Sequence, residues 1–209
     1  MEYETTHVKD VYNHISDLFS LSRAYLWKGV KNFVNSLDSD SLILDAGCGN
    51  GKNMFREDCR FIGLDNSEKM IDIVKSQNKW GIIGDIRELP FDDDMFDAAI
   101  SVAVIHHLYD INDRIQAVKE MVRVVKTGSK IFIQVWENMK EKNHKFEHIN
   151  NNDYLVKWDN RDGNIYRRYY HLFDRDEFID LFSEIDNVKI CNIEYEMENW
   201  IIILQKIEK

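Results

Sequence analysis

A glycine-rich segment at residues 45–51, Asp-Ala-Gly-Cys-Gly-Asn-Gly, has the residue types of a loop that wraps around a ligand. It follows the apolar run 42–44, which is typical of a buried strand. Gly47 and Gly49 let a ligand lie against the backbone, where a Cβ atom would clash. The spacing is G-x-G-x-G, so Lys52 stands where a dinucleotide-binding loop has its last glycine. We expect a helix to follow, with its first amides facing the ligand; the alternative is an ordinary strand-to-helix turn.

Three acids stand at the ends of three successive apolar runs, residues 42–44, 61–64 and 80–83. After Asp45, the second acid is Asp65, which can accept hydrogen bonds from both hydroxyls of a ribose. The third is Asp85, which can accept from an adenine amino group while the amide of Ile86 meets a ring nitrogen. Each acid alone could instead cap a turn or a helix. Together they predict a nucleoside site at the rim where open α/β sheets bind ligands.

The elements that position these residues alternate along the chain. Apolar runs typical of strands cover residues 42–44, 61–64, 80–83, 95–104 and 130–136. Helical spacing covers residues 67–77, which Ser67 can cap, and residues 112–125. This alternation predicts an α/β fold with a parallel sheet and helices on both faces. Ahead of it, the spacing in residues 8–37 predicts two helices with a break at 20–22.

The pattern changes after Trp136. Residues 137–165 are polar and rich in Asn, Lys and His, and we expect an insertion or a mobile loop there. Asp174 and Glu177 form a capping-box pair for a helix to about residue 182. The runs 188–195 and 200–206 have a tight link, which favours an antiparallel pair. We therefore expect a single domain over residues 1–209, with N-terminal helices over 1–37 and an insertion at about 137–165.

Composition limits the classes of function. With 44% hydrophobic residues the chain should fold, and no apolar run approaches the ~20 residues that cross a membrane. The N-terminus lacks the pattern of a signal peptide, so we expect the protein in the cytoplasm, with the nucleus as a second location. The three cysteines favour neither a disulfide framework nor a metal site. A net charge of −10 argues against broad nucleic-acid binding by this chain alone.

A further motif, Phe-Asp-Ala-Ala-Ile, covers residues 96–100. With the glycine loop, Asp65 and Gly84-Asp85, it completes in order the motifs of the class I S-adenosylmethionine (SAM)-dependent methyltransferases, which the chain resembles over nearly its whole length. The resemblance implies SAM as cofactor and a Rossmann-like sheet of seven mostly parallel strands, the last one antiparallel. The implied cofactor-binding residues are Asp45, Gly47, Gly49, Asp65, Ser67, Asp85, Ile86 and Val102.

More specific segments occur at residues 11–15, 22–27, 101–107, 135–136, 168–172 and 198–200. In these the chain resembles the eukaryotic tRNA wobble-uridine methyltransferases, which esterify 5-carboxymethyluridine in the anticodon. The resemblance implies the tRNA anticodon loop as substrate and a small zinc-binding activator protein as partner. In this fold the strand at 80–83 lies at a sheet edge, where another chain can add a strand. We expect the activator to cover Trp80, Ile82 and Ile83 in part; the alternative is an edge protected by its own loops.

The acceptor in that reaction is a carboxylate, which is ionised at neutral pH and needs no general base. The pocket must align it with the methyl group and hold its charge, for which a bidentate arginine is suited. The implied catalytic residues are His107, Arg23, Arg168, His171 and Trp136. Each has a structural alternative: the arginines can pair with surface acids or lie on a solvated strand, and His107 can cap a helix. Trp136 and Trp200 can stack on bases or belong to the core.

Two other functions stay open. A methyltransferase for a small metabolite fits the acidic net charge and predicts a closed apolar pocket without a zinc-binding partner. A non-enzymatic scaffold that only keeps the fold is the third alternative. The intact glycines and the acids Asp45, Asp65 and Asp85 argue against the scaffold.

Overall fold

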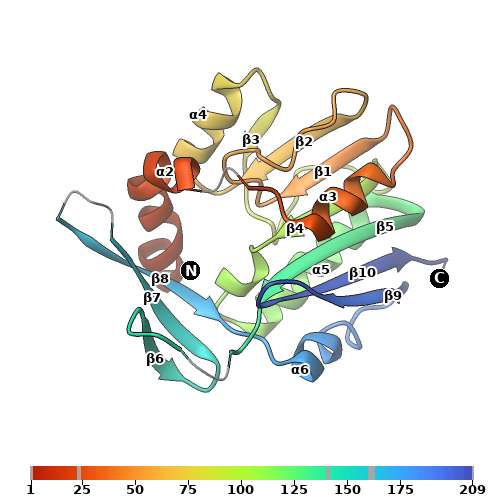
Figure 1. Cartoon of the computed structure of the whole chain (residues 1–209). Helices are drawn as coiled ribbons and strands as arrows, with labels where there is room; N and C mark the ends of the chain where they lie inside the picture. The colour runs from red at the N-terminus through yellow and green to blue at the C-terminus, as the bar shows by residue number, and fades with distance from the viewer. Residues whose placement is uncertain (1, 23–24, 140–141, 160–162, 209) are drawn as a thin grey trace.

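The computed structural model describes residues 2–22, 25–139, 142–159 and 163–208. Its centre is a seven-stranded sheet with the order β3-β2-β1-β4-β5-β10-β9 (Figure 1). The parallel strands are β1 (Leu42–Ala46), β2 (Arg60–Asp65), β3 (Gly81–Ile83), β4 (Phe96–Val102) and β5 (Val125–Trp136). The last strand, β10 (Asn199–Lys206), is antiparallel to β5 and to β9 (Val188–Tyr195). The predicted Rossmann-like α/β fold is confirmed.

Helices cover both faces of this sheet, as the alternation predicted. Along β5, Phe132 faces α3 (Lys28–Asn35), whereas its neighbours Ile131 and Ile133 pack in the cluster of α5 (Ile111–Val124) and α6 (Arg175–Asp180). Successive strand residues point to opposite faces, so a strand covered on both sides must be apolar throughout. Helix α4 (Glu68–Ser76) lies over β2 and β3. No helix within the described ranges is long and apolar enough to cross a membrane.

The helix starts follow the predicted capping signals. Ser67 accepts a hydrogen bond from the amide of Met70 at 3.3 Å and begins α4. Asp174 and Glu177 form the expected capping box at the start of α6. Such caps satisfy backbone amides that have no partner inside the helix. Polar side chains at these places therefore have a structural role.

A second sheet stands where we expected an insertion or a mobile loop. Strands β6 (Phe146–Asn150), β7 (Asp153–Asp159) and β8 (Ile165–His171) form an antiparallel three-stranded sheet beside α2 (Asp10–Ser22) (Figure 1). The prediction of a loop is therefore wrong for most of the described part of residues 137–165. Its strands mix apolar residues with charged ones, such as Glu147, Lys157 and Arg167, so the average composition of the segment does not reveal them.

Two further predictions are wrong in detail. The short helix α1 (Glu2–Glu4) and the π-helix η1 (Thr5–Lys9) precede α2. Helix α2 continues to Ser22, so the break lies after residues 20–22 rather than within them. Residues 47–59 form turns and irregular loop instead of the expected helix, and within residues 47–51 three glycines have left-handed φ angles of 83°, 51° and 72°. A helix cannot start through such a backbone.

Candidate active site

A cavity opens at the carboxyl ends of the parallel strands, with α2 and β8 in its walls. It encloses about 1200 Å³, the open mouth included. The predicted site residues that line it are Gly47, Gly49, Asp65, Asp85, Ile86, Val102, His107 and Trp136. The glycine loop and two of the rim acids thus surround one shared space, with His107 and Trp136 on the same cavity. Within the described chain, Asp45, Ser67, Arg168 and His171 lie outside this lining.

The glycine loop is shaped for close approach. At Gly47, with φ of 83°, an added Cβ would run into the side chain of Val104. At Gly49, an added Cβ would meet nothing within 4 Å, so the backbone there faces open space. Asp65 holds the loop, because its carboxylate accepts hydrogen bonds from the amides of Gly49 at 2.8 Å and Ser67 at 2.9 Å. Each of its oxygens keeps a second lone pair for a ligand hydroxyl.

The carboxylate of Asp45 lies behind the loop and is fully buried. Neither of its oxygens has a donor in hydrogen-bonding geometry among the described residues. Burial raises its pKa to about 7, the nearby charge of Asp65 adds to this, and Lys52, Asn53 and Lys79 oppose it. A buried carboxylate without a donor is costly unless a cation reaches it. From behind the loop, the charge of this carboxylate therefore favours a ligand with an ammonium group on the cavity side of the loop.

Asp85 is tied to an arginine that the sequence did not single out. Its oxygens accept from Arg87 Nε at 2.9 Å and Nη2 at 2.6 Å. Burial would raise the pKa of Asp85, but these hydrogen bonds outweigh burial and the pKa is lowered. Arg87 Nη1 also donates to Asp113 at 2.7 Å and to Glu4 at 2.8 Å. The N-terminal helix is thereby fastened to the ligand wall, where Glu4 and Arg87 themselves line the cavity.

A chain of hydrogen bonds forms the opposite wall. His107 Nδ1 lies 2.6 Å from the carbonyl oxygen of Tyr169, so this nitrogen carries the proton and donates it. Burial lowers the pKa of His107 to about 3, and the ring is neutral at pH 7. Its Nε2 then accepts from the hydroxyl of Tyr12 at 3.0 Å. The Tyr12 oxygen lies 3.4 Å from the hydroxyl of Tyr170, which also lines the cavity.

Arg168 stands directly behind the two phenols. Its Nη1 donates to the hydroxyl of Tyr170 at 2.8 Å and to that of Tyr12 at 3.5 Å. The residue is 3% exposed, and its guanidinium lies 5.1 Å from the ring centre of Trp158. In the part of the chain that the structure describes, no carboxylate forms an ion pair with Arg168. A buried cation without a counter-charge makes this wall a place for an anion.

Three further residues that the sequence singled out, His171, Ser67 and Trp200, do not line the cavity. Arg23 lies outside the described residues. His171 points to the other face of β8 from Arg168, where it contacts the carboxylates of Asp153 at 2.7 Å and Glu177 at 2.6 Å. The side chain of Ser67 caps α4 rather than facing the cavity. Trp200 packs against the core cluster under α5, away from the cavity lining.

Three residues of the site, Tyr12, Tyr170 and Arg87, were not predicted from the sequence. Tyr170 shares a strand face with Arg168 two positions before it, and this alternation is a signal that the sequence contains. Tyr12 lies on a helix, and only tertiary packing brings it to within 3.0 Å of His107, 95 residues away. Arg87 follows Asp85 by two residues, and nothing local distinguishes it from a surface arginine.

Comparisons with known proteins agree with this geometry. The family described as "Methyltransferase domain" matches residues 44–133. The tRNA (carboxymethyluridine(34)-5-O)-methyltransferase of Schizosaccharomyces pombe is 32% identical over 99% of this chain and 99% of its own length. The enzyme of that name from Arabidopsis thaliana is 44% identical over 65% of this chain, which spans only 34% of the relative. A Haloferax volcanii methyltransferase, solved with the Trm112 methyltransferase activator, has the same fold, with a TM-score of 0.72, 15% identity and coverage of 97% and 98%.

The fold and the site define a SAM-dependent methyltransferase. Within that class, the chain belongs to the family of the tRNA (carboxymethyluridine(34)-5-O)-methyltransferases, as the full-length similarity to the Schizosaccharomyces pombe protein shows. The residues present fit the cofactor: Asp45 suits its ammonium group, Asp65 its ribose, and the open backbone at Gly49 a close contact. SAM supplies an activated methyl group on a positively charged sulfur.

Proposed function

We propose that this enzyme methylates the carboxylate of 5-carboxymethyluridine at the wobble position of tRNA and forms the methyl ester. The observation that carries the proposal is the buried Arg168, which has its charge directed at two phenol hydroxyls on the cavity wall. An anionic acceptor would neutralise this charge, whereas an uncharged metabolite would leave it buried and unpaired. The activity named for the Schizosaccharomyces pombe relative supports the same acceptor.

The wall residues have distinct roles in this proposal. The acceptor carboxylate, with an ordinary pKa near 4, has no proton to lose, so no side chain need act as a base. Neutral His107 accepts from the Tyr12 hydroxyl and so fixes its direction. Arg168 donates to the Tyr170 oxygen, which leaves the Tyr170 hydrogen to point toward Tyr12 or toward the acceptor. Alignment and exclusion of water then account for most of the rate.

The test uses labelled SAM, the enzyme with its activator, and two tRNAs that differ only in the carboxymethyl group at the wobble uridine. We expect label only in the modified tRNA, in a product that mild base hydrolyses because it is an ester. Equal labelling of both tRNAs, or none of either, would contradict the proposal. Label in small carboxylic acids but not in tRNA would favour the metabolite alternative.

Neighbouring arginines provide a matched pair of variants. Arg168→Gln removes the buried charge, whereas Arg167→Gln removes a charge from the exposed side of the same strand. We expect Arg168→Gln to raise KM for modified tRNA at least tenfold, since a lost charged hydrogen bond costs roughly 1.5–3 kcal/mol. Arg167→Gln should stay within about twofold. Tyr170→Phe, which keeps the packing of the wall, should also raise KM; unchanged values for both wall variants would remove the basis of the proposal.

We also propose that a small zinc-binding activator pairs with the edge of β3. This strand ends the large sheet, and the side chains of Trp80 and Ile83 are 69% and 53% exposed. Exposed strand edges accept strands from other chains. A methyltransferase with this fold has been solved with the Trm112 activator, which supports such a partner.

The opposite edge of the sheet offers a control for this partner. Ile83→Lys changes the β3 edge, and Ile190→Lys changes β9, whose Ile190 is 37% exposed. We expect co-purification with the activator to be lost for Ile83→Lys and kept for Ile190→Lys. Loss of the complex only in Ile190→Lys would place the partner at β9 and contradict the proposal.

A further inference from the structure

The small sheet has two chemically different faces, fixed by its pairing register. Strand neighbours Phe146 and Val156, His148 and Tyr154, and Val156 and Arg168 share one face. We call this the aromatic face; its other members are Trp158, Tyr166 and Tyr170. The same register puts all three carboxylates of β6–β8, those of Glu147, Asp153 and Asp159, on the other face. In a chain with a net charge of −10, this separation removes like charges from one surface.

The aromatic face continues from the cavity. Trp136, which lines the cavity, stacks on Tyr170 with ring centres 4.5 Å apart and 23° between their planes. Phe146 follows at 6.5 Å from Trp136, and Tyr154 at 6.1 Å from Phe146. His148 lies 5.1 Å from Tyr154. Aromatic rings therefore form a row that leads outward from the cavity.

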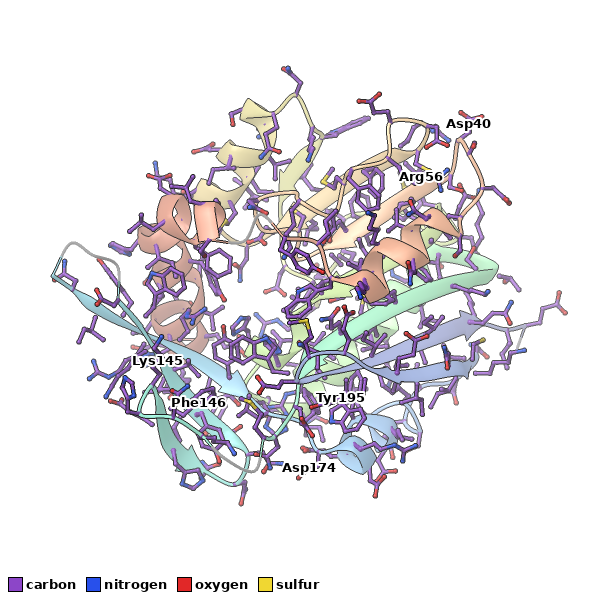
Figure 2. All side chains as sticks on the ribbon, viewed as in Figure 1. Asp40, Arg56, Lys145, Phe146, Asp174 and Tyr195 are labelled. Carbon is purple, nitrogen blue, oxygen red and sulfur yellow. The ribbon has the colours of Figure 1, made fainter. Side chains whose placement is uncertain are left out.

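The outer part of this row is accessible. Helix α2 covers the other end of the face, where Phe19 contacts Trp158 and His14 stacks on Tyr166. Phe146 and Tyr154 are partly exposed, and His148 is exposed. Figure 2 shows Phe146 on β6 and Lys145 directly before it, at the opposite end of the molecule from Asp40.

Positive charge accompanies the row. Lys142 Nζ lies 4.7 Å from the ring centre of Tyr154. It donates to the side-chain oxygen of Asn138 at 2.8 Å and to the carbonyl of Met139 at 2.6 Å, both of which are neutral. Among the described residues, no carboxylate forms an ion pair with Lys142. A cation over an aromatic ring, beside a sheet face without carboxylates, suits a polyanion with flat bases.

We propose that the nucleotides next to the wobble uridine stack on the row Phe146, Tyr154 and His148, with Lys142 at the RNA backbone. This inference rests on the proposed function and extends it to the rest of the anticodon loop. Protein surfaces recognise unpaired RNA by stacking its bases on aromatic rings, with cations at the phosphates. The row begins at Trp136, so a base inside the cavity and its neighbours outside can be held together.

Binding of an anticodon stem-loop RNA that lacks the carboxymethyl group tests the row directly. The enzyme, with its activator and SAM, is titrated by fluorescence anisotropy, and 2-aminopurine beside the wobble uridine reports stacking. We expect Tyr154→Leu to raise Kd about tenfold, within the range measured for one stacked base, and to remove the quenching of 2-aminopurine. Lys142→Ala, a change near the surface that leaves the rings in place, should also raise Kd.

Lys157→Ala is the matched control, because Lys157 lies on the opposite face of β7 and pairs with Glu147. Its Kd should equal that of the unchanged enzyme. Equal Kd values for Tyr154→Leu, Lys142→Ala and Lys157→Ala would overturn the inference. A concentration-dependent dimer that Tyr154→Leu abolishes, together with unchanged RNA binding, would also overturn it, since the row would then face a second copy.

Methyl transfer separates this inference from the function on which it rests. With modified tRNA, Tyr154→Leu should raise KM and leave kcat within about twofold, because the row binds RNA away from the reacting atoms. If the variants transfer methyl groups to tRNA with unchanged KM, the function stands and the row is refuted. If no modified tRNA is methylated by the unchanged enzyme, the function fails, whatever the binding data show.

Discussion

The Asp45 carboxyl links the stability of the protein to pH. Its pKa is raised from 3.8 to about 7, so in the folded protein it stays protonated over a range in which the unfolded chain has lost the proton. The stability that this proton provides is complete below about pH 4 and is lost as the pH rises through about 7. The size of the effect is on the order of 4 kcal/mol.

Asp45→Asn should therefore be more stable than the unchanged protein at about pH 8, without SAM, and closer to it at about pH 5. Urea unfolding at both pH values measures this difference. The variant should also bind SAM at least tenfold more weakly, because it has no charge for the ammonium group. Equal stability of the two proteins at about pH 8 would mean that a hydrogen-bond donor or a cation compensates the Asp45 carboxylate in the folded protein.

The same group predicts how transfer depends on pH. Below about pH 7 Asp45 becomes protonated, so KM for SAM should rise as the pH falls. The value of kcat should stay nearly constant from about pH 6 to 9, because the acceptor is ionised and His107, with a pKa of about 3, stays neutral. Steady-state rates at saturating tRNA separate the two constants. A steep change of kcat near pH 7 would instead indicate a general base.

Among the structural elements, the glycine loop can be compared with β5, because each contains a glycine with a left-handed backbone. Gly47 and Gly128 have similar φ angles, 83° and 86°, but an added Cβ would strike Val104 only at Gly47. Alanine at either position should cost roughly 1–2 kcal/mol from the left-handed backbone. Gly47→Ala should cost about 1–3 kcal/mol more, from overpacking, and should weaken SAM binding. Urea unfolding of both variants measures the difference; equal losses would show that the loop can move away from Val104.

The inner strands of the large sheet are predictable because burial on both faces makes them largely apolar, as in residues 96–102. The small sheet is not, because its strands mix apolar residues with charged ones, such as Glu147, Lys157 and Arg167, and only part of it shows an apolar alternation. In β7 the sequence does contain this alternation, at Tyr154, Val156 and Trp158. The π-helix at residues 5–9 has no comparable pattern.

The site is predictable as far as its residues follow strands. Asp65 and Asp85 are found because parallel strands end at one rim. Tyr12 cannot be placed this way, since its position depends on how α2 packs against β8. His171 is adjacent to Tyr170, but one step along a strand turns a side chain to the opposite face. Sequence order alone could not tell which of the two would reach the cavity.

At the scale of the whole molecule, an ion pair between Glu4 and Arg87 helps to hold the N-terminal helices at the cavity. Glu4 is 8% exposed, and its other oxygen accepts from the amide of Tyr109 at 2.9 Å. Glu4→Gln should lower the free energy of unfolding by about 1.5–3 kcal/mol, and SAM should dissociate faster. Glu2→Gln, an exposed change in the same short helix, is the control for both measurements. Equal dissociation rates for the two variants would mean that Glu4 does not hold the helix over the cofactor.

The wall behind the acceptor joins distant parts of the polypeptide, since the hydroxyls of Tyr12 and Tyr170 meet across 158 residues. A ribosome releases Tyr12 long before Tyr170, and β10 must then enter between β5 and β9, both made earlier. Nascent chains that end before β8 therefore have no anion pocket, even though the glycine loop has already emerged. Competence to modify RNA should therefore arise late and abruptly during synthesis.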